Sequence, residues 1–192
     1  SDLVSVRASD GDGGGEGFLI TPTGMAYDAL ASEDVVFMRL DGSTEGRRKP
    51  SSEWRFHRDL YLDRADAGAI VHAHSPFATS LACLRREIPP FHYMIARFGG
   101  DNLRCAAYAT FGTQALSDAV LQAIAGRRAC LLANHGMLVF GDDLGQTFDL
   151  AVELETLCEQ YWRACQLGEP VLLDAAEMRE VLARFGSYGQ QA

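Results

Sequence analysis

Three histidines in two apolar segments could bind one metal ion. His72 and His74 lie two residues apart in the run Ile70-Val71-His72-Ala73-His74, which is typical of a strand. Both side chains then project from the same side of a sheet. His135 ends a second apolar run, and Gly136 after it allows a sharp turn. Three imidazoles with an oxygen ligand favour zinc over calcium or magnesium, because those ions prefer shells made of oxygen.

Each of these histidines also has a structural interpretation, as a hydrogen-bonded imidazole in a half-buried strand. For His135 alone that interpretation is preferred, but the pair at positions 72 and 74 favours a metal site. His57 and His92 have no ligand-like neighbour and are expected to be structural. An open zinc site can activate a water for hydrolysis, or polarise a carbonyl and hold an enediolate. The histidines alone do not choose between these reactions.

The segment from Lys49 to His57 is a second candidate. Pro50 and the pair Ser51-Ser52 predict the start of a helix whose first turn carries Glu53. Free amides and two hydroxyls at a helix N-terminus can hold a phosphate, while Glu53 serves as metal ligand or base. The structural alternative makes Ser51 an ordinary N-cap and Glu53 a surface acid that matches the helix dipole.

Strand-like and helix-like patterns alternate around these residues, so the fold class is α/β or α+β. Short β-branched runs predict strands at 35–40, 69–74, 129–133 and 137–140. The glycine-rich tract from Gly11 to Gly17 is expected to be a hairpin loop between strands at 4–7 and 18–20. A phosphate-binding glycine loop is the weaker interpretation, because no Gly-Lys-Ser/Thr follows the tract.

Four helices are predicted from capping residues and apolar stripes. They open at Ser75-Pro76, at Thr113, at about Leu144 and at Asp174, where Glu177 completes a capping box. The helix over 144–167 carries a stripe that is expected to face the core throughout: Leu150, Leu154, Leu157, Cys158, Tyr161 and Cys165.

Composition narrows the function further. The 192 residues carry a formal net charge of −9 and a sequence pI near 4.9, which argues against nucleic-acid binding because phosphates require a surplus of basic residues. No apolar stretch approaches the roughly 20 residues that cross a bilayer, and the first ten residues do not resemble a signal peptide. The sequence therefore predicts a single cytoplasmic domain over 1–192 with no membrane partner. The five widely spaced cysteines are expected to be buried, reduced thiols.

Six sequence blocks together resemble the class II aldolase/adducin family. Any one of them is a weak signal, but six in the right order over nearly the whole chain make a specific match. The blocks are Ile20 to Gly24, Lys49 to His57, His72 to Ser75, Ile88 to Met94, Tyr108 to Thr113 and Asn134 to Gly136.

The resemblance implies zinc on His72, His74 and His135, with Glu53 completing the resting shell and then acting as base. It implies cleavage of a ketose 1-phosphate, L-fuculose 1-phosphate or a similar sugar, to dihydroxyacetone phosphate and an aldehyde such as L-lactaldehyde. It also assigns the substrate phosphate to four residues: Thr23, Gly24, Ser51 and Ser52.

Further implications concern the aldehyde and the assembly. Tyr93 of a neighbouring subunit would protonate the aldehyde oxygen, and Phe111, Phe185 and Tyr188 match aromatic residues around the aldehyde. The family implies a homotetramer with active sites between subunits. The implied fold is a three-layer sandwich in which helices cover a mostly antiparallel mixed sheet.

The sequence also departs from the family pattern, and alternatives remain. The family's N-terminal helix and its phosphate-binding Gly-Asn pair are not found ahead of Val4-Ser5-Val6. Within the family, a ribulose-phosphate 4-epimerase is disfavoured by Glu53 and Tyr93, and a methylthioribulose-phosphate dehydratase is a further alternative. A non-catalytic, adducin-like interaction module would lack the three histidines. An unrelated zinc hydrolase would leave Ser51, Ser52 and Tyr93 unexplained.

Overall fold

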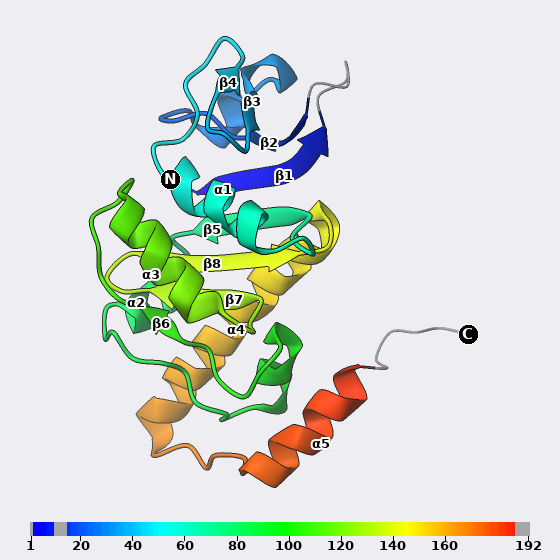
Figure 1. The fold of residues 1–192 in the computed structure, drawn as a ribbon. Helices are drawn as coiled ribbons and strands as arrows, with labels where there is room; N and C mark the ends of the chain where they lie inside the picture. The colour runs from blue at the N-terminus through cyan, green and yellow to red at the C-terminus, as the bar shows by residue number, and fades with distance from the viewer. Residues whose placement is uncertain (1, 10–14, 187–192) are drawn as a thin grey trace.

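The computed structural model describes residues 2–9 and 15–186, which form an eight-stranded sheet with helices on both faces (Figure 1). The strand order is β4-β3-β2-β1-β5-β8-β7-β6, and every neighbouring pair is antiparallel except β6 with β7. The strands are β1 Leu3–Ser9, β2 Glu16–Ile20, β3 Val36–Arg39, β4 Thr44–Glu45, β5 Ala69–Ala73, β6 Cys105–Ala106, β7 Ala129–Leu132 and β8 Gly136–Gly141. The expected mostly antiparallel mixed sheet is confirmed.

The helices complete three layers. One face of the sheet packs against α1 and α3, and the other packs against α2 and α4, while α5 contacts the 3-10 helix η3. Their bounds are α1 Trp54–Asp63, α2 Pro76–Ala82, η3 Tyr93–Phe98, α3 Gln114–Ile124, α4 Leu144–Leu167 and α5 Ala175–Phe185, with two short 3-10 helices at η1 Tyr27–Ala29 and η2 Ser32–Asp34. Within the described ranges, no helix combines the length and the apolar character needed to cross a membrane.

Strand β5 lies near the middle of the sheet, between β1 and β8. Its side chains alternate between the two faces because the period of a strand is two residues. Ile70 lies in the core cluster beneath α1 and α3, whereas Val71 and Ala73 lie in the cluster beneath α2 and α4. His72 shares the face of Ile70 and contacts Phe56 of α1, with ring centroids 5.4 Å apart. A histidine on a central strand is thereby held rigidly beneath the start of α1.

Most predicted boundaries are confirmed, but the start of α1 differs. Thr113 and Asp174 cap their helices through side-chain acceptors, and the capping box with Glu177 is present. Glu53, however, is the N-cap residue of α1 and does not lie in its first turn. The Trp54 amide donates to the carbonyl of Ser51, so residues 51–54 form a tight turn before the helix begins.

The expected burial of α4 and of the cysteines is partly wrong. The stripe on α4 is buried as far as Cys158, whereas Tyr161 is half-buried and Cys165 is exposed. The last turns of α4 run past the edge of the sheet, so nothing in the sheet covers them (Figure 1). Cys83, just beyond α2, is also exposed. All five thiols are free.

The glycine-rich tract joins two strands that pair as expected. Ser9 of β1 lies opposite Glu16 of β2 in an antiparallel register, which confirms the hairpin. Residues 11–14 of the tract, like Tyr188, lie outside the described residues.

Candidate metal centre

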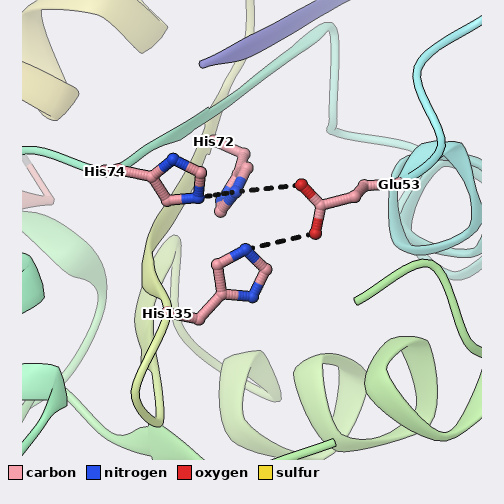
Figure 2. Close-up of side chains that lie close together, drawn as sticks. All are labelled: Glu53, His72, His74 and His135. Carbon is pink, nitrogen blue, oxygen red and sulfur yellow. Dashed lines mark hydrogen bonds and ion pairs between the residues drawn. The ribbon is translucent and has the colours of Figure 1, made fainter. Parts of the chain in front are cut away.

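Four side chains from three parts of the chain meet at one point (Figure 2). His72 comes from β5, His74 follows that strand, His135 lies in the turn between β7 and β8, and Glu53 precedes α1. One potential ligand atom from each lies within 4.8 Å of all the others. Antiparallel pairing of β5 with β8 brings residues 63 positions apart in the sequence onto one spot. The sequence-predicted ligand set is therefore assembled by the fold.

The histidine rings are oriented as metal ligands require. The Nδ1–H of His72 donates to the carbonyl of Met137 at 2.8 Å, so the lone pair of its Nε2 points into the cluster. The Nε2 atoms of His72 and His74 are 3.1 Å apart. Glu53 approaches from the other side, with its Oε2 3.5 Å from His72 Nε2 and its Oε1 3.2 Å from His135 Nε2 (Figure 2). Nitrogen lone pairs that converge beside a carboxylate form a natural cation site.

Electrostatics favour the deprotonated ligand forms. Burial, together with the neighbouring His72, lowers the pKa of His74 to about 4, so this imidazole is neutral at pH 7. Burial of Glu53 opposes its ionisation, but its close polar contacts with His135 and His72 outweigh burial and lower the pKa of the carboxyl group. The Oε1 atom of Glu53 is buried and accepts no hydrogen bond of good geometry within the described residues. Neutral imidazoles with a carboxylate oxygen form a donor set that suits zinc.

An open pocket of about 340 Å³ adjoins the cluster. Phe111, which the resemblance placed near the aldehyde, is 65% exposed and lines this pocket. Three other lining residues lie in the sequence blocks that resemble the family but were not predicted to belong to the site: Tyr108, Ala109 and Asn134. Asn134 has a φ of 53°, and an asparagine just before His-Gly is a signal for such a left-handed turn position. The pocket combines ligand atoms at its base with aromatic rings at its wall.

The four residues assigned to phosphate also come together. Thr23, Gly24, Ser51 and Ser52 line a small recess of about 30 Å³ that borders Glu53. The Thr23 amide donates to the carbonyl of Lys49, and the Ser51 amide donates to the carbonyl of Thr21. These bonds hold the Thr-Pro-Thr-Gly loop against the start of α1.

Gly112 allows the loop that carries Phe111 to lie close to Ser52. Gly112 has a φ of 74°, and a Cβ there would lie 2.9 Å from the carbonyl oxygen of Ser52. Arg55 of α1 donates to the carbonyl of Gly112 at 2.6 Å. The loop that carries Phe111 is thus clamped onto the serine pair.

Two predicted residues are not brought to the cluster within one chain. Tyr93 is half-exposed at the start of η3, where its ring lies 4.9 Å from that of His92, and it is absent from the lining of the pocket beside the histidines. Phe185, at the end of α5, packs instead against the core on the α4 side.

The two histidines expected to be structural have structural contacts. His57 is fully buried, and its Nδ1 lies 2.6 Å from the hydroxyl of Ser5. His92 accepts a hydrogen bond from the amide of Met94 and so caps η3.

The sequence matches the family model described as the class II aldolase and adducin N-terminal domain over residues 3–162. A 5-methylthioribulose-1-phosphate/5-deoxyribulose-1-phosphate aldolase from Rhodospirillum rubrum is 53% identical over 98% of this chain and 83% of its own length. An L-fuculose phosphate aldolase from Escherichia coli is 43% identical over 97% of this chain and 84% of its own length.

The fold has equally clear counterparts. A solved L-fuculose 1-phosphate aldolase superposes with a TM-score of 0.90 at 41% identity, covering 97% of this chain and 86% of the other. The eight-stranded sheet with helices on both faces therefore has the same fold as this solved aldolase.

Proposed function

The chain belongs to the class II aldolase and adducin family, and from that premise we propose that it is a metal-dependent aldolase that cleaves a ketose 1-phosphate to dihydroxyacetone phosphate and an aldehyde. The convergence of Glu53, His72, His74 and His135 carries this proposal. A non-catalytic member of the family has no need for three imidazoles that converge on a buried carboxylate.

The proposed metal is zinc, held by the three histidines with Glu53 as a fourth ligand at rest. Bound there, it would act as a Lewis acid that polarises the ketone of the substrate. The hydroxyls of Ser51 and Ser52, with Thr23 and the backbone at Gly24, are proposed to bind the phosphate, since they line one recess beside Glu53. With the phosphate in that recess, the reacting carbons would lie beside Glu53, which lines both the recess and the open pocket.

Glu53 is the proposed base in the direction of synthesis. Its carboxylate borders both the phosphate recess and the open pocket, so it can reach a proton on the carbon next to the ketone of dihydroxyacetone phosphate. The resulting enediolate adds to the aldehyde, whose oxygen gains a proton as it becomes a hydroxyl. Tyr93 is the proposed donor of that proton. It must come from a neighbouring subunit, because it lies away from the cluster of its own chain. We therefore also propose a homotetramer, acting in the cytoplasm.

The aldehyde is the part of the substrate on which the relatives differ. Cleavage between carbons 3 and 4 yields acetaldehyde from 5-deoxyribulose 1-phosphate and a methylthio derivative of it from 5-methylthioribulose 1-phosphate. L-Fuculose 1-phosphate yields lactaldehyde, which carries a further hydroxyl. The wall of the open pocket presents Tyr108, Ala109 and Phe111. These aromatic and small side chains on one wall, with the higher identity to the Rhodospirillum rubrum protein, support 5-deoxyribulose and 5-methylthioribulose 1-phosphates as preferred substrates.

A substrate screen tests the proposal. Purified, zinc-loaded protein is incubated separately with 5-deoxy-D-ribulose 1-phosphate, 5-methylthioribulose 1-phosphate, L-fuculose 1-phosphate and L-ribulose 5-phosphate, and release of dihydroxyacetone phosphate is measured. We expect release from the first three, with the highest kcat/KM for one of the first two. Release from none would refute the aldolase, and formation of D-xylulose 5-phosphate from L-ribulose 5-phosphate, measured separately, would indicate an epimerase.

A further inference from the structure

Arg85 occupies a backbone conformation that is costly for its residue type. It lies three residues beyond α2 with a φ of 54°, in the left-handed region where glycine is the common choice at a helix end. Within the described part of the chain its guanidinium forms no ion pair, so an ordinary surface salt bridge does not account for it. Strain of this kind persists where the surrounding contacts need the side chain in that place.

The side chain reaches from α2 to the turn that carries His135. Arg85 Nε donates to Asn134 Oδ1 at 2.5 Å, and the guanidinium carbon lies 5.3 Å from the ring centroid of Tyr108. Asn134 and Tyr108 both line the open pocket. The Arg85 guanidinium group therefore contacts two residues that line the pocket.

The backbone adds a second connection at the same place. The carbonyl of Ala82 accepts from the Arg85 amide at 3.0 Å and from the Asn134 amide at 3.1 Å. Asn134, with a φ of 53°, directly precedes His135, whose own amide donates to the carbonyl of Leu132. The direction of the His135 ring thus depends on a three-residue turn that is held from outside by the end of α2.

We infer that Arg85 is a positioning residue for the metal centre: through its hydrogen bond to Asn134 it holds the β7–β8 turn so that His135 points at the other ligands. This inference rests on the proposed metal site. Partners that hydrogen-bond a metal ligand typically change metal affinity 10- to 100-fold when removed, and Arg85 acts one residue further out, through Asn134.

Variants that tolerate the left-handed conformation separate positioning from folding. Arg85→Asn removes the guanidinium but suits a positive φ, and Asn134→Gly removes the acceptor and also suits it. Zinc affinity is measured by competition with a chromophoric chelator, and the visible spectrum of the cobalt-substituted protein reports the geometry of the site. Arg163→Ala, which removes an exposed pair with Glu159 on α4, is the matched control.

We expect each single variant to bind zinc about 10-fold or more weakly than the wild type and to shift the cobalt spectrum. The double variant should be no worse than the weaker single variant, because both remove one contact. The melting temperature of metal-free Arg85→Asn should be no lower than that of the wild type, and Arg163→Ala should bind zinc normally. Wild-type zinc affinity in Arg85→Asn, or additive losses of zinc affinity in the double variant, would overturn this inference but not the proposed metal site. Failure of the wild type to bind zinc would overturn the metal site as well.

Discussion

Glu53 is both the N-cap residue of α1 and a member of the candidate metal cluster. Its main chain forms the N-cap of α1, while its carboxylate lies against His72 and His135. A side chain at an N-cap usually accepts from its own helix, but no such bond forms here. The carboxylate is therefore free to face the cluster, which is what a residue alternating between metal ligand and base requires.

Glu53→Gln should keep much of the metal but lose proton abstraction. The amide retains an oxygen ligand and the shape of the side chain, but it cannot accept a proton at neutral pH. Solvent-deuterium exchange into dihydroxyacetone phosphate should fall by about 10²- to 10⁴-fold. Normal exchange in a variant that contains metal would remove Glu53 as the base.

Tyr93→Phe should slow the cleavage reaction more than it slows this exchange. Only cleavage and its reverse move a proton off or onto the aldehyde oxygen, so loss of the phenol leaves carbon deprotonation intact. We expect about 10²-fold slower cleavage with exchange changed only a few-fold. Equal slowing of both measured rates would contradict the assigned role.

At the scale of elements, loops tie the phosphate recess and the pocket to α1. Gly112→Ala should destabilise the protein by about 1–3 kcal/mol and raise KM for the sugar phosphate, because the new Cβ would meet the carbonyl of Ser52. Gly126→Ala is the matched control, since its φ is 67° and a Cβ there meets nothing within 4 Å. Urea unfolding and initial-rate kinetics should show stability losses in both variants and a raised KM only in Gly112→Ala. A normal KM in Gly112→Ala would show that the loop contact does not shape the site.

Asp34 anchors the segment that leads into the phosphate recess. Hydrogen bonds from Arg48 above all, with the Ala31 amide and Arg47, lower its pKa from 3.8 to about 2. A carboxyl group whose pKa is lowered on folding stabilises the protein above its unfolded pKa and loses that contribution as pH falls.

Asp34→Asn should therefore be less stable than the wild type at pH 7, and the gap should close between about pH 4 and pH 2. This difference in stability is measured from the urea unfolding midpoints of the metal-free variant and wild type at each pH. Glu159→Gln, which removes only an exposed pair on α4, should show almost no gap at any pH. A gap for Asp34→Asn that is independent of pH would contradict the assignment.

The sequence predicted those features of the elements that depend on interactions between residues close together in the chain. The caps at Thr113 and Asp174 and the alternation that places His72 and His74 on one face are local, and they were predicted correctly. The exposure of Cys165 depends on where the sheet ends beneath α4, which no local pattern contains. The hydrogen bond between Arg85 and Asn134 joins residues 49 positions apart, and no local sequence pattern predicts it.

At the scale of the whole molecule, one chain brings together most of the residues of the proposed site, but not Tyr93. The metal cluster, the phosphate recess and one pocket wall come from a single chain, whereas Tyr93 lies apart on η3 beside α5. The pocket beside the cluster is lined by residues before α1, by the loop with Phe111 and by the β7–β8 turn, and Tyr93 is not among its lining residues. A donor for the aldehyde oxygen must then approach from outside, which is the physical reason for proposing active sites between subunits.

The metal content of the purified protein tests the central claim most directly. After zinc loading and exhaustive dialysis, elemental analysis should find about one zinc ion per chain in the wild type and in His92→Ala, and almost none in His74→Ala. Absence of zinc from the wild type, or equal loading of His74→Ala, would contradict the account.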